Sequence, residues 1–268
     1  MKKQIGKIGI LCMAVLLILA GCGSGQGAKD ANGSKKTEQD VVIYVTRHGK
    51  TMLNQEKRVQ GFADSPLVDS GTEVAKQLGK GLKGTHFDAV YSSDSGRARE
   101  TADAILETQG QKHLKLHESK KLREVCFGKY EGDLDANMWG DIAKQLGYPD
   151  QPTLMKAISA QRVTIEQSLE KLQKLDDTGM AETYPAVRNR MQQELTKVAK
   201  KQADQGGGNV LLVSHGMAIG ALISNLTDDY HGEPFENASV TKIRYKHGKF
   251  HVESINDMSY VEKGTSKD

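Results

Sequence analysis

The stretch VVIYVTRHGKTMLN, residues 41–54, decides the fold expected for this chain. Its apolar and largely β-branched first half predicts a buried strand, and this strand ends at the charged pair Arg47 and His48. In open α/β sheets, ligands bind at the carboxyl ends of the strands. We therefore expect Arg47 and His48 to face a ligand site rather than the core.

The residues that follow are compatible with a phosphoryl group as that ligand. Gly49 is expected to allow close backbone approach, and Thr51 and Asn54 add short polar side chains. Arginine and imidazole groups are suited to bind a tetrahedral dianion. A lone Arg-His-Gly tripeptide is more often a solvated loop, so the interpretation depends on the rest of the chain.

From residue 40 onward, strands are predicted to alternate with helices. Apolar runs predict strands at residues 87–91, 113–117 and 210–213, and a hairpin at 240–245 and 250–255. Helical periodicity predicts helices at residues 70–83, 96–108, 186–204 and 217–226. Gly79 and Gly81 are expected to weaken the first of these helices, and the polar residues 92–95 are suited to capping the second. Residues 130–183 are helical and polar in pattern, which indicates an inserted helical cap. The predicted fold class is α/β: a three-layer sandwich with a mainly parallel central sheet and helices on both faces.

The amino terminus is expected to be an export signal. Three lysines precede the apolar residues 8–20, a run too short for a membrane-spanning helix. The sequence Leu19-Ala20-Gly21-Cys22 resembles the bacterial lipoprotein signal, in which the cysteine receives a lipid and the chain is cleaved before it. The alternatives are an uncleaved anchor or a plain secretory signal. We expect residues 1–21 to be the signal peptide, 22–39 a flexible Gly/Ser/Lys-rich tether, and 40–268 the folded domain.

Charge and cysteine content narrow the possible partners. Loss of residues 1–21 removes three lysines and no acidic residue, which leaves 34 basic and 34 acidic residues. A nucleic-acid-binding protein would carry a basic excess, so that class is excluded. Only Cys126 would remain beside a lipidated Cys22, so neither an internal disulfide nor a cysteine-based metal site is expected.

Four polar groups of residues each follow a predicted strand. They are Arg47 with His48, residues 92–97, Arg123 with Glu124, and Ser214 with His215. If the strands are parallel neighbours, these groups meet in one pocket. Two histidines, two arginines and a carboxylate suit phosphoryl transfer, with one imidazole as nucleophile, guanidinium groups holding the phosphoryl oxygens and a carboxylic acid protonating the departing alkoxide.

Several motifs together resemble the histidine phosphatase superfamily, in the order found in its phosphoglycerate-mutase-like branch. The motifs are Arg47-His48-Gly49 with Thr51 and Asn54, Ser92-Ser93-Asp94 with Arg97-Ala98 and Thr101-Ala102, Leu122-Arg123-Glu124 before Phe127-Gly128 and Glu131-Gly132, and Ser214-His215-Gly216. The resemblance covers residues 41–256 and rests on the order of these motifs, since no single motif is decisive alone. Lys50, Val68 and Ser95 depart from the usual pattern, which puts the substrate preference in doubt more than the activity.

The resemblance implies a role for each candidate site residue and no cofactor or metal. These are His48 as the phosphorylated residue, Glu124 as the proton donor, Arg47, Arg97 and His215 as the phosphate clamp, and Asn54 on the pocket wall. Glu182 resembles a weaker family element whose role stays open, and Arg99 is interpreted as a solvated helix residue.

The expected function is a phosphatase for small phosphomonoesters, anchored to the outside of the cell membrane through lipid on Cys22. One alternative is a phosphoglycerate-type mutase, which needs a diphosphorylated sugar-acid primer. Another is a non-catalytic phosphate-binding lipoprotein, although His48 and Glu124 are both present. A metallohydrolase is disfavoured because a pocket rich in arginine and poor in aspartate does not suit a divalent cation. Activity is therefore expected to survive chelation.

Overall fold

The computed structural model of this protein describes residues 39–266. These residues belong to one compact unit, Thr37–Asp268. The predicted signal peptide, Cys22 and nearly all of the predicted tether lie outside the described residues. Within residues 39–266, no helix has the length and apolar character that crossing a membrane requires.

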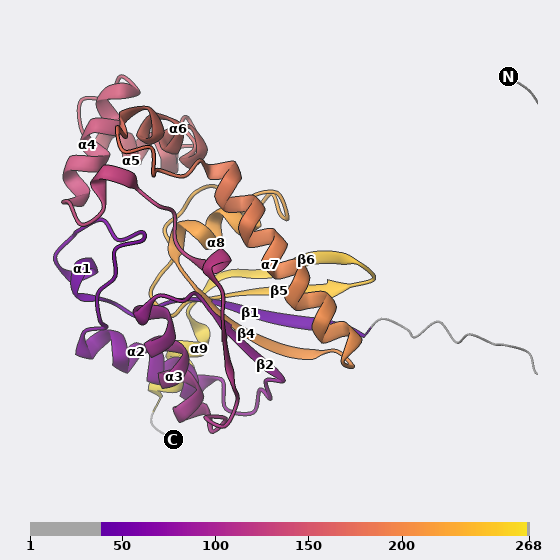
Figure 1. Ribbon diagram of the computed structural model, residues 1–268. Coiled ribbons are helices and arrows are strands. Elements are labelled where there is room, and N and C mark those ends of the chain that lie inside the picture. Colours follow the sequence, from indigo (N-terminus) through magenta and orange to yellow (C-terminus); the bar gives the residue numbers. More distant parts are fainter. Residues whose placement is uncertain (1–38, 267–268) are drawn as a thin grey trace, which may run out of the picture. The chain divides into compact units, whose positions relative to one another are not determined.

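A six-stranded sheet forms the centre of the unit, in the order β3-β2-β4-β1-β5-β6 (Figure 1). The strands are β1 (Val41–Arg47), β2 (Ala89–Ser92), β3 (Leu116–Glu118), β4 (Gly208–Ser214), β5 (Val240–Lys246) and β6 (Lys249–Asp257). Strands β3, β2, β4 and β1 pair in parallel, and the β5–β6 hairpin joins β1 antiparallel. This confirms the predicted α/β class with a mainly parallel sheet.

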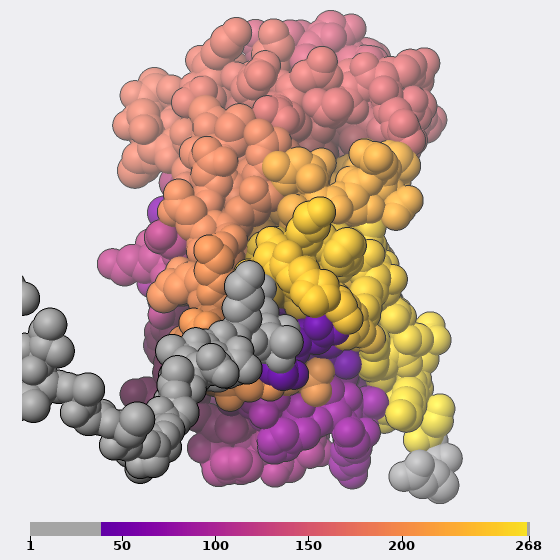
Figure 2. Space-filling view, turned by 90° about the vertical axis from the view of Figure 1, so that its right-hand side faces the viewer, coloured from indigo at the N-terminus to yellow at the C-terminus, as the bar shows by residue number. Residues whose placement is uncertain are grey.

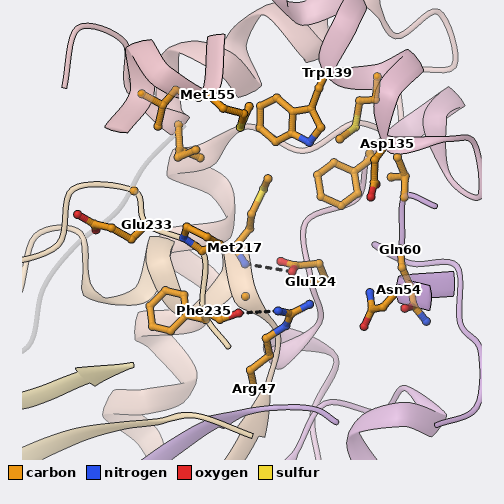
Figure 3. Close-up of a pocket in the computed structure, with 18 of the residues that line it drawn as sticks. Arg47, Asn54, Gln60, Glu124, Asp135, Trp139, Met155, Met217, Glu233 and Phe235 are labelled. Atoms are coloured by element: carbon orange, nitrogen blue, oxygen red, sulfur yellow. Dashed lines mark hydrogen bonds between the residues drawn. The ribbon is translucent and has the colours of Figure 1, made fainter. Parts of the chain in front are cut away.

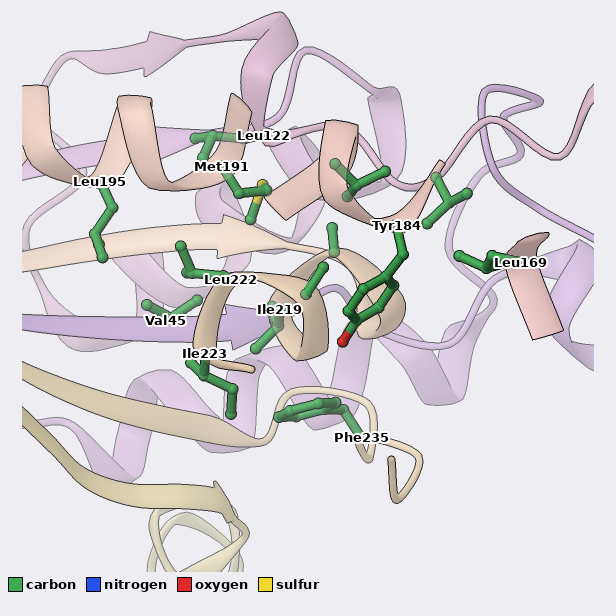
Figure 4. Packing of buried hydrophobic residues seen from close by; sticks show 14 of the residues in the cluster. Val45, Leu122, Leu169, Tyr184, Met191, Leu195, Ile219, Leu222, Ile223 and Phe235 are labelled. Carbon is green, nitrogen blue, oxygen red and sulfur yellow. The ribbon is translucent and has the colours of Figure 1, made fainter. Parts of the chain in front are cut away.

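Alternate residues of the central strands enter two separate hydrophobic clusters. Val41, Ile43 and Val45 of β1 belong to one cluster, whereas Tyr44 belongs to the other. Because side chains alternate across a strand, two clusters mean that both faces of the sheet are covered. Helices α7 (Tyr184–Asp204) and α8 (Gly216–Ile223) cover one face, where Met191 and Leu195 of α7 pack with Val45 (Figure 4).

The other face carries α2 (Asp69–Gly81), α3 (Gly96–Gln109) and α9 (Ser259–Thr265). Glycines let these helices approach closely. The sequence suggests that Gly79 and Gly81 weaken α2, but a Cβ at Gly79 would overlap with α3 atoms and one at Gly81 with the Tyr260 carbonyl of α9. Both positions therefore serve helix packing, at the expense of helix propensity.

The predicted cap is helical. Residues 130–183 contain α4 (Asp135–Gln145), α5 (Gln151–Ser159) and α6 (Ile165–Leu175), and no strand. A capping box of Thr164 and Gln167 begins α6, and the Asp150 side chain accepts from the Thr153 N–H at the start of α5. The cap helices gather at one end of the unit (Figure 2).

Several boundaries differ from the prediction for identifiable reasons. Phe87 was predicted within a strand, but its backbone N–H and carbonyl both bond to the Gln111 side chain, so β2 starts two residues later. The predicted strand at 113–117 is reduced to the short edge strand β3. Helix α1 (Met52–Gln55) and α9 were not predicted, because one turn and seven residues are too short for a periodic signal.

Candidate active site

The carboxyl ends of β1 and β4 bring the two histidines together. Arg47 pairs with Ser214 in the parallel register of these strands, so the residues that follow, His48 and His215, emerge side by side. Their ring centroids are 5.2 Å apart, with an angle of 60° between the planes. Both residues are almost completely buried. The expectation that distant motifs meet at this edge of the sheet is confirmed for the two histidines.

His48 has a defined tautomer. Its Nδ1 lies 2.7 Å from the carbonyl oxygen of Gly49, which can only accept, so Nδ1 carries the proton and Nε2 keeps its lone pair. Burial first, and then the charges of Arg97 and Arg47, hold the pKa of His48 well below its usual 6.5. A neutral imidazole with a free Nε2 is the form that can act as a nucleophile.

His215 has the opposite tautomer. Its Nδ1 accepts from the Nε of Arg97 at 3.2 Å, so Nε2 carries the proton. Burial, followed by Arg97 and His48, lowers the pKa of His215 well below its usual value, which keeps the ring neutral. The Nε2 atom is buried and has no hydrogen-bond partner among the described residues. It is therefore a donor that lacks an acceptor.

Arg47 supplies a second donor of the same kind. Its Nη1 donates to the carbonyl of Phe235 (Figure 3), while its buried Nε has no partner among the described residues. Burial lowers the pKa of Arg47 from its usual value, and the nearby Glu124 opposes this. Unpaired buried donors are costly unless an acceptor arrives. An anionic oxygen would satisfy the donors of Arg47 and His215 beside His48.

Arg97 is fully buried and bonded to protein groups on all three nitrogens. Besides its bond to His215, it forms a 2.8 Å ion pair with Asp64 and donates to the carbonyls of Gly61 and Ala63. Arg97 does not line the cavity that lies between the sheet and the cap helices. The structure thus places Arg97 where it orients His215, and its direct contact with a substrate stays a prediction.

Asp64 also changes the expected capping of α3. The polar residues 92–95 were predicted to cap this helix, but the N-cap Ser95 makes no capping hydrogen bond. The Asp64 carboxylate instead accepts from the Gly96 N–H while it pairs with Arg97. The side chain of Asp94, from the predicted cap, forms an ion pair with Arg123. One loop carboxylate therefore fixes both the start of α3 and the arginine in its first turn. Arg99 is exposed, which agrees with its interpretation as a solvated helix residue. Its Nη1 lies 3.7 Å from Oε2 of Glu118.

Glu124 is buried at the amino end of α8. Its carboxylate accepts from the backbone N–H groups of Val125, Met217 and Ala218 at 2.8 to 3.1 Å. Burial is the larger influence and raises the pKa of Glu124, while these hydrogen bonds and Arg97 oppose the rise. The carboxyl group lines the cavity beside Arg47 and His48. Its raised pKa suits a group that must be protonated before it can donate.

The loop that carries Glu124 is held by Arg190 of α7. Arg190 donates to the carbonyls of Lys121, Arg123 and Glu124 at 2.6 to 2.9 Å, and pairs with both carboxylate oxygens of Glu182. Glu182 in turn accepts from the Cys126 N–H at 3.0 Å. These contacts answer the open question about Glu182: it belongs to the support of the Glu124 loop.

Of the three residues after His48 that were expected at the ligand site, Asn54 lines the cavity, and Gly49 and Thr51 do not. Gly49 approaches protein backbone, since a Cβ there would overlap with the carbonyl of Gly71. Thr51 is fully buried, caps α1 and donates to the Gln60 side chain at 2.6 Å, so it serves the loop and does not line the cavity. Asn54 does line the cavity, while its Oδ1 accepts from the Thr51 N–H at 3.3 Å.

The cavity between the sheet and the cap has a volume of about 530 Å³. Its sheet side presents Arg47, His48 and Glu124, and its cap side is mostly apolar, with Met138 and Trp139 from α4 (Figure 3). This volume falls in the range of pockets that enclose drug-sized ligands. Among residues 39–266, no group of three or more His, Cys, Asp or Glu could hold a metal ion.

Some contributors to the site could not be found by reading the sequence. The Phe235 carbonyl bonds to Arg47, and the Asn237 side chain donates to the His48 carbonyl at 2.8 Å. Arg190 also escaped notice, because a single arginine on an amphipathic helix has no distinguishing pattern. Of the two residues that hold the Glu124 loop, Arg190 and Glu182, only Glu182 was noticed in the sequence, because it lies in a stretch that resembles an element of the family.

Comparisons with known proteins agree with this arrangement. Residues 43–164 and 146–258 match the model of the histidine phosphatase superfamily, branch 1. A crystal structure of phosphoglycerate mutase from Bacillus anthracis has 45% sequence identity and a TM-score of 0.81, covering 86% of this chain and 99% of that one. The structure of Bacillus stearothermophilus YhfR has 26% identity and a TM-score of 0.61, covering 82% and 99%. The probable phosphoglycerate mutase GpmB of Salmonella arizonae is 26% identical over 235 residues, 83% of this chain and 95% of its own length.

Proposed function

The chain belongs to the histidine phosphatase superfamily, branch 1, and from this premise we propose that it hydrolyses phosphomonoesters through a phosphohistidine on His48. The observation that carries the proposal is the free Nε2 of His48 beside two buried donors without acceptors, on Arg47 and His215. This combination offers a nucleophile and a place for phosphoryl oxygens. The match to the histidine phosphatase superfamily and the similarity to a probable phosphoglycerate mutase support the reaction type at the level of the superfamily.

The proposed reaction has two steps. The lone pair of His48 Nε2 attacks phosphorus, the bond to the ester oxygen breaks, and Glu124 gives its proton to the departing alkoxide. In the second step, a water molecule attacks the phosphohistidine, the ionised Glu124 takes its proton, and inorganic phosphate leaves with His48 restored. Arg47 and His215 donate to the phosphoryl oxygens in both steps.

The test of this proposal is trapping of the intermediate. The purified full-length protein is incubated with a ³²P-labelled phosphomonoester and quenched in alkali, where a phosphoramidate persists. We expect acid-labile label on His48, and loss of both label and turnover in His48→Ala. The control is His251→Ala, since His251 is an exposed residue of β6 outside the cavity. Label that persists in His48→Ala, or that maps to a serine, would overturn the proposal.

A phosphoglycerate-type mutase is the second candidate, and the 45% identity to the Bacillus anthracis phosphoglycerate mutase favours it. A mutase must bind the carboxylate of a phosphorylated sugar acid. Two arginines among the described residues line the cavity, Arg47 and Arg58, so Arg58 is the candidate to bind that carboxylate. Arg58 is exposed, and its Nη1 donates to the Gly132 carbonyl at 2.8 Å. Phosphorus NMR of 3-phosphoglycerate incubated with the protein, with and without the diphosphorylated primer 2,3-bisphosphoglycerate, separates the two: free phosphate supports the phosphatase, and the 2-phospho isomer supports the mutase. A third candidate, non-catalytic phosphate binding, predicts neither product.

The proposal includes the place of the enzyme. We infer that Cys22 carries a lipid that anchors the chain to the outer face of the cell membrane, with residues 1–21 removed. The sequence Leu19-Ala20-Gly21-Cys22 supports this inference. Stable anchoring needs more than one acyl chain, because a single chain binds membranes only marginally.

A further inference from the structure

The cap side of the cavity contains a carboxylate that the proposed reaction does not use. Asp135 begins α4 and lines the cavity, and its backbone N–H donates to the Lys57 carbonyl at 2.9 Å. Its side chain makes no hydrogen bond or ion pair with the described residues. In Figure 3, Asp135 points from the cap into the cavity, on the same wall as Trp139. An acidic residue in a first helical turn favours the helix dipole, but that role does not require it to face a partly buried cavity.

Asp135 lines the same cavity as Arg47, which lies at the phosphate end. Burial raises the pKa of Asp135, and the positive charge of Arg47 opposes that rise. The same interaction acts on the pKa of Arg47 in the opposite direction. A ligand that binds both residues in this cavity therefore needs groups of opposite charge.

Aromatic side chains surround the rest of the cavity. Phe127, Trp139, Tyr230 and Phe235 all line it, and the ring centroids of Tyr230 and Phe235 are 5.4 Å apart. Aromatic faces attract cations, and quaternary ammonium groups are bound in this way. Arg58 and Glu233 also line the cavity, but both are exposed. Arg58 donates to the Gly132 carbonyl, and Glu233 accepts from the His231 N–H. A second anionic group that reaches Asp135 and the aromatic rings would be repelled by the Asp135 carboxylate.

We propose that the cavity selects phosphomonoesters of short amino alcohols, with the ammonium group bound by Asp135 and the aromatic rings of the lining. This inference rests on the proposed function, since His48 and Arg47 receive the phosphate. The amino alcohol leaves as the product of the first step and keeps its positive charge. Substrates with a carboxylate beside the phosphate, such as 3-phosphoglycerate, are disfavoured by the same carboxylate.

The test uses two substrates of nearly identical shape. Phosphocholine carries a quaternary ammonium group, and 3,3-dimethylbutyl phosphate is its uncharged carbon isostere. For the full-length wild-type protein we expect kcat/KM to be about tenfold or more higher for phosphocholine, as cation–π and ionic contacts of this kind allow. Asp135→Asn is expected to lower that ratio by about fivefold or more. The same change should raise hydrolysis of 3-phosphoglycerate.

The control variant is Glu170→Gln, which removes a negative charge from the same cap. Glu170 is exposed on α6 and does not line the cavity, so this variant should keep the wild-type ratio. Thermal unfolding checks that Asp135→Asn is folded. The ratio of kcat/KM for the two substrates in the wild-type protein tests the inference even if that variant does not fold. A wild-type ratio near one, or an equal ratio in Asp135→Asn, overturns the inference.

The outcomes also separate the two proposals. If para-nitrophenyl phosphate is cleaved and phosphohistidine forms, but neither isostere reacts, the substrate class is wrong and the phosphatase assignment stands. If none of the three is cleaved and no phosphohistidine forms, the proposed function fails and this inference fails with it.

Discussion

At the residue scale, the protonation states of His48 and Glu124 set the pH range of the proposed reaction. His48 must be neutral to attack, and its lowered pKa places the acid limb of the rate profile below pH 6.5. Glu124 must be protonated to donate, and its raised pKa keeps it protonated to a higher pH than an ordinary carboxyl. Activity on alkyl phosphates is therefore expected to fall as pH rises through the pKa of Glu124.

Glu124→Gln tests this assignment with two kinds of leaving group. An alkoxide needs a proton to leave, whereas para-nitrophenolate hardly does. We expect kcat to fall by about 10²–10⁴-fold on alkyl phosphates, with a much smaller loss on para-nitrophenyl phosphate and a flattened alkaline limb. Rates for both substrates are measured across pH. Equal losses on both, with phosphate binding intact, would assign the proton donor to another carboxylate.

Arg190 is expected to act as a positioning residue for Glu124. Arg190→Lys keeps the positive charge but cannot hold three loop carbonyls and the two Glu182 oxygens at once. We predict that kcat falls roughly tenfold on alkyl phosphates and by less on aryl phosphates. Glu124→Gln is expected to affect the two substrate types in the same order. The control is Arg188→Lys, two residues away on α7. The Nη1 of Arg188 lies 3.7 Å from the Glu166 carboxylate of α6, and within the described part of the chain Arg188 forms no hydrogen bond or ion pair with the Glu124 loop. If the loss on both substrate types is equal, Arg190 serves stability alone.

At the element scale, close contacts between helices depend on residues that lower helix propensity. In α2, Gly81 lies against the Tyr260 carbonyl of α9, so Gly81→Ala forces the two helices apart. We predict that this substitution lowers the free energy of unfolding by about 1–3 kcal/mol, as overpacking typically does.

Gly140→Ala is the matched control for that prediction. Gly140 lies within α4, and no atom lies within 4 Å of the position of an added Cβ. Alanine there should be neutral or raise stability by up to about 1 kcal/mol through helix propensity. Urea unfolding of both variants, followed by circular dichroism, measures the difference. A neutral Gly81→Ala would mean that α9 can shift without cost.

The elements also show what the sequence could and could not predict. The strand that starts at residue 41 and the strand at residues 210–213 were predicted because apolar runs rich in β-branched residues end in polar motifs. In the structure, their parallel pairing places His48 beside His215. Contacts between loops and helices had no such pattern. The pairing of Asp64 with Arg97, and the bonds of Arg190 to the Glu124 loop, depend on distances across the fold that no local sequence period records.

At the scale of the whole molecule, the cap and the sheet share the cavity between them. Sequence periodicity predicted a helical insertion but not its apolar inner wall, because Met138, Trp139 and Met155 are equally compatible with a closed core. The polar residues of the sheet side were predicted from motifs, whereas the apolar lining of the cap side required the structure.

The position of the whole chain in the cell gives a separate prediction. Cys22→Ala removes the proposed site of lipid attachment, which lies outside the described residues. We expect the variant to lose labelling by a radioactive fatty acid, to keep its uncleaved signal and to fail to stay membrane-bound as a lipoprotein. Phosphatase activity of the folded unit should be unaffected. Unchanged labelling and processing would exclude the lipid anchor.

The pairing of β1 with β4 also links catalysis to the order in which the chain is made. β1 and His48 leave the ribosome before the cap and α7, whereas His215 is synthesised only after them. An incomplete chain therefore holds one histidine without the other. Contacts between segments so distant in the chain close slowly compared with helices. During refolding from urea, we therefore expect turnover to return later than the helical circular dichroism signal. The recovery of activity then reports when β1 and β4 have paired.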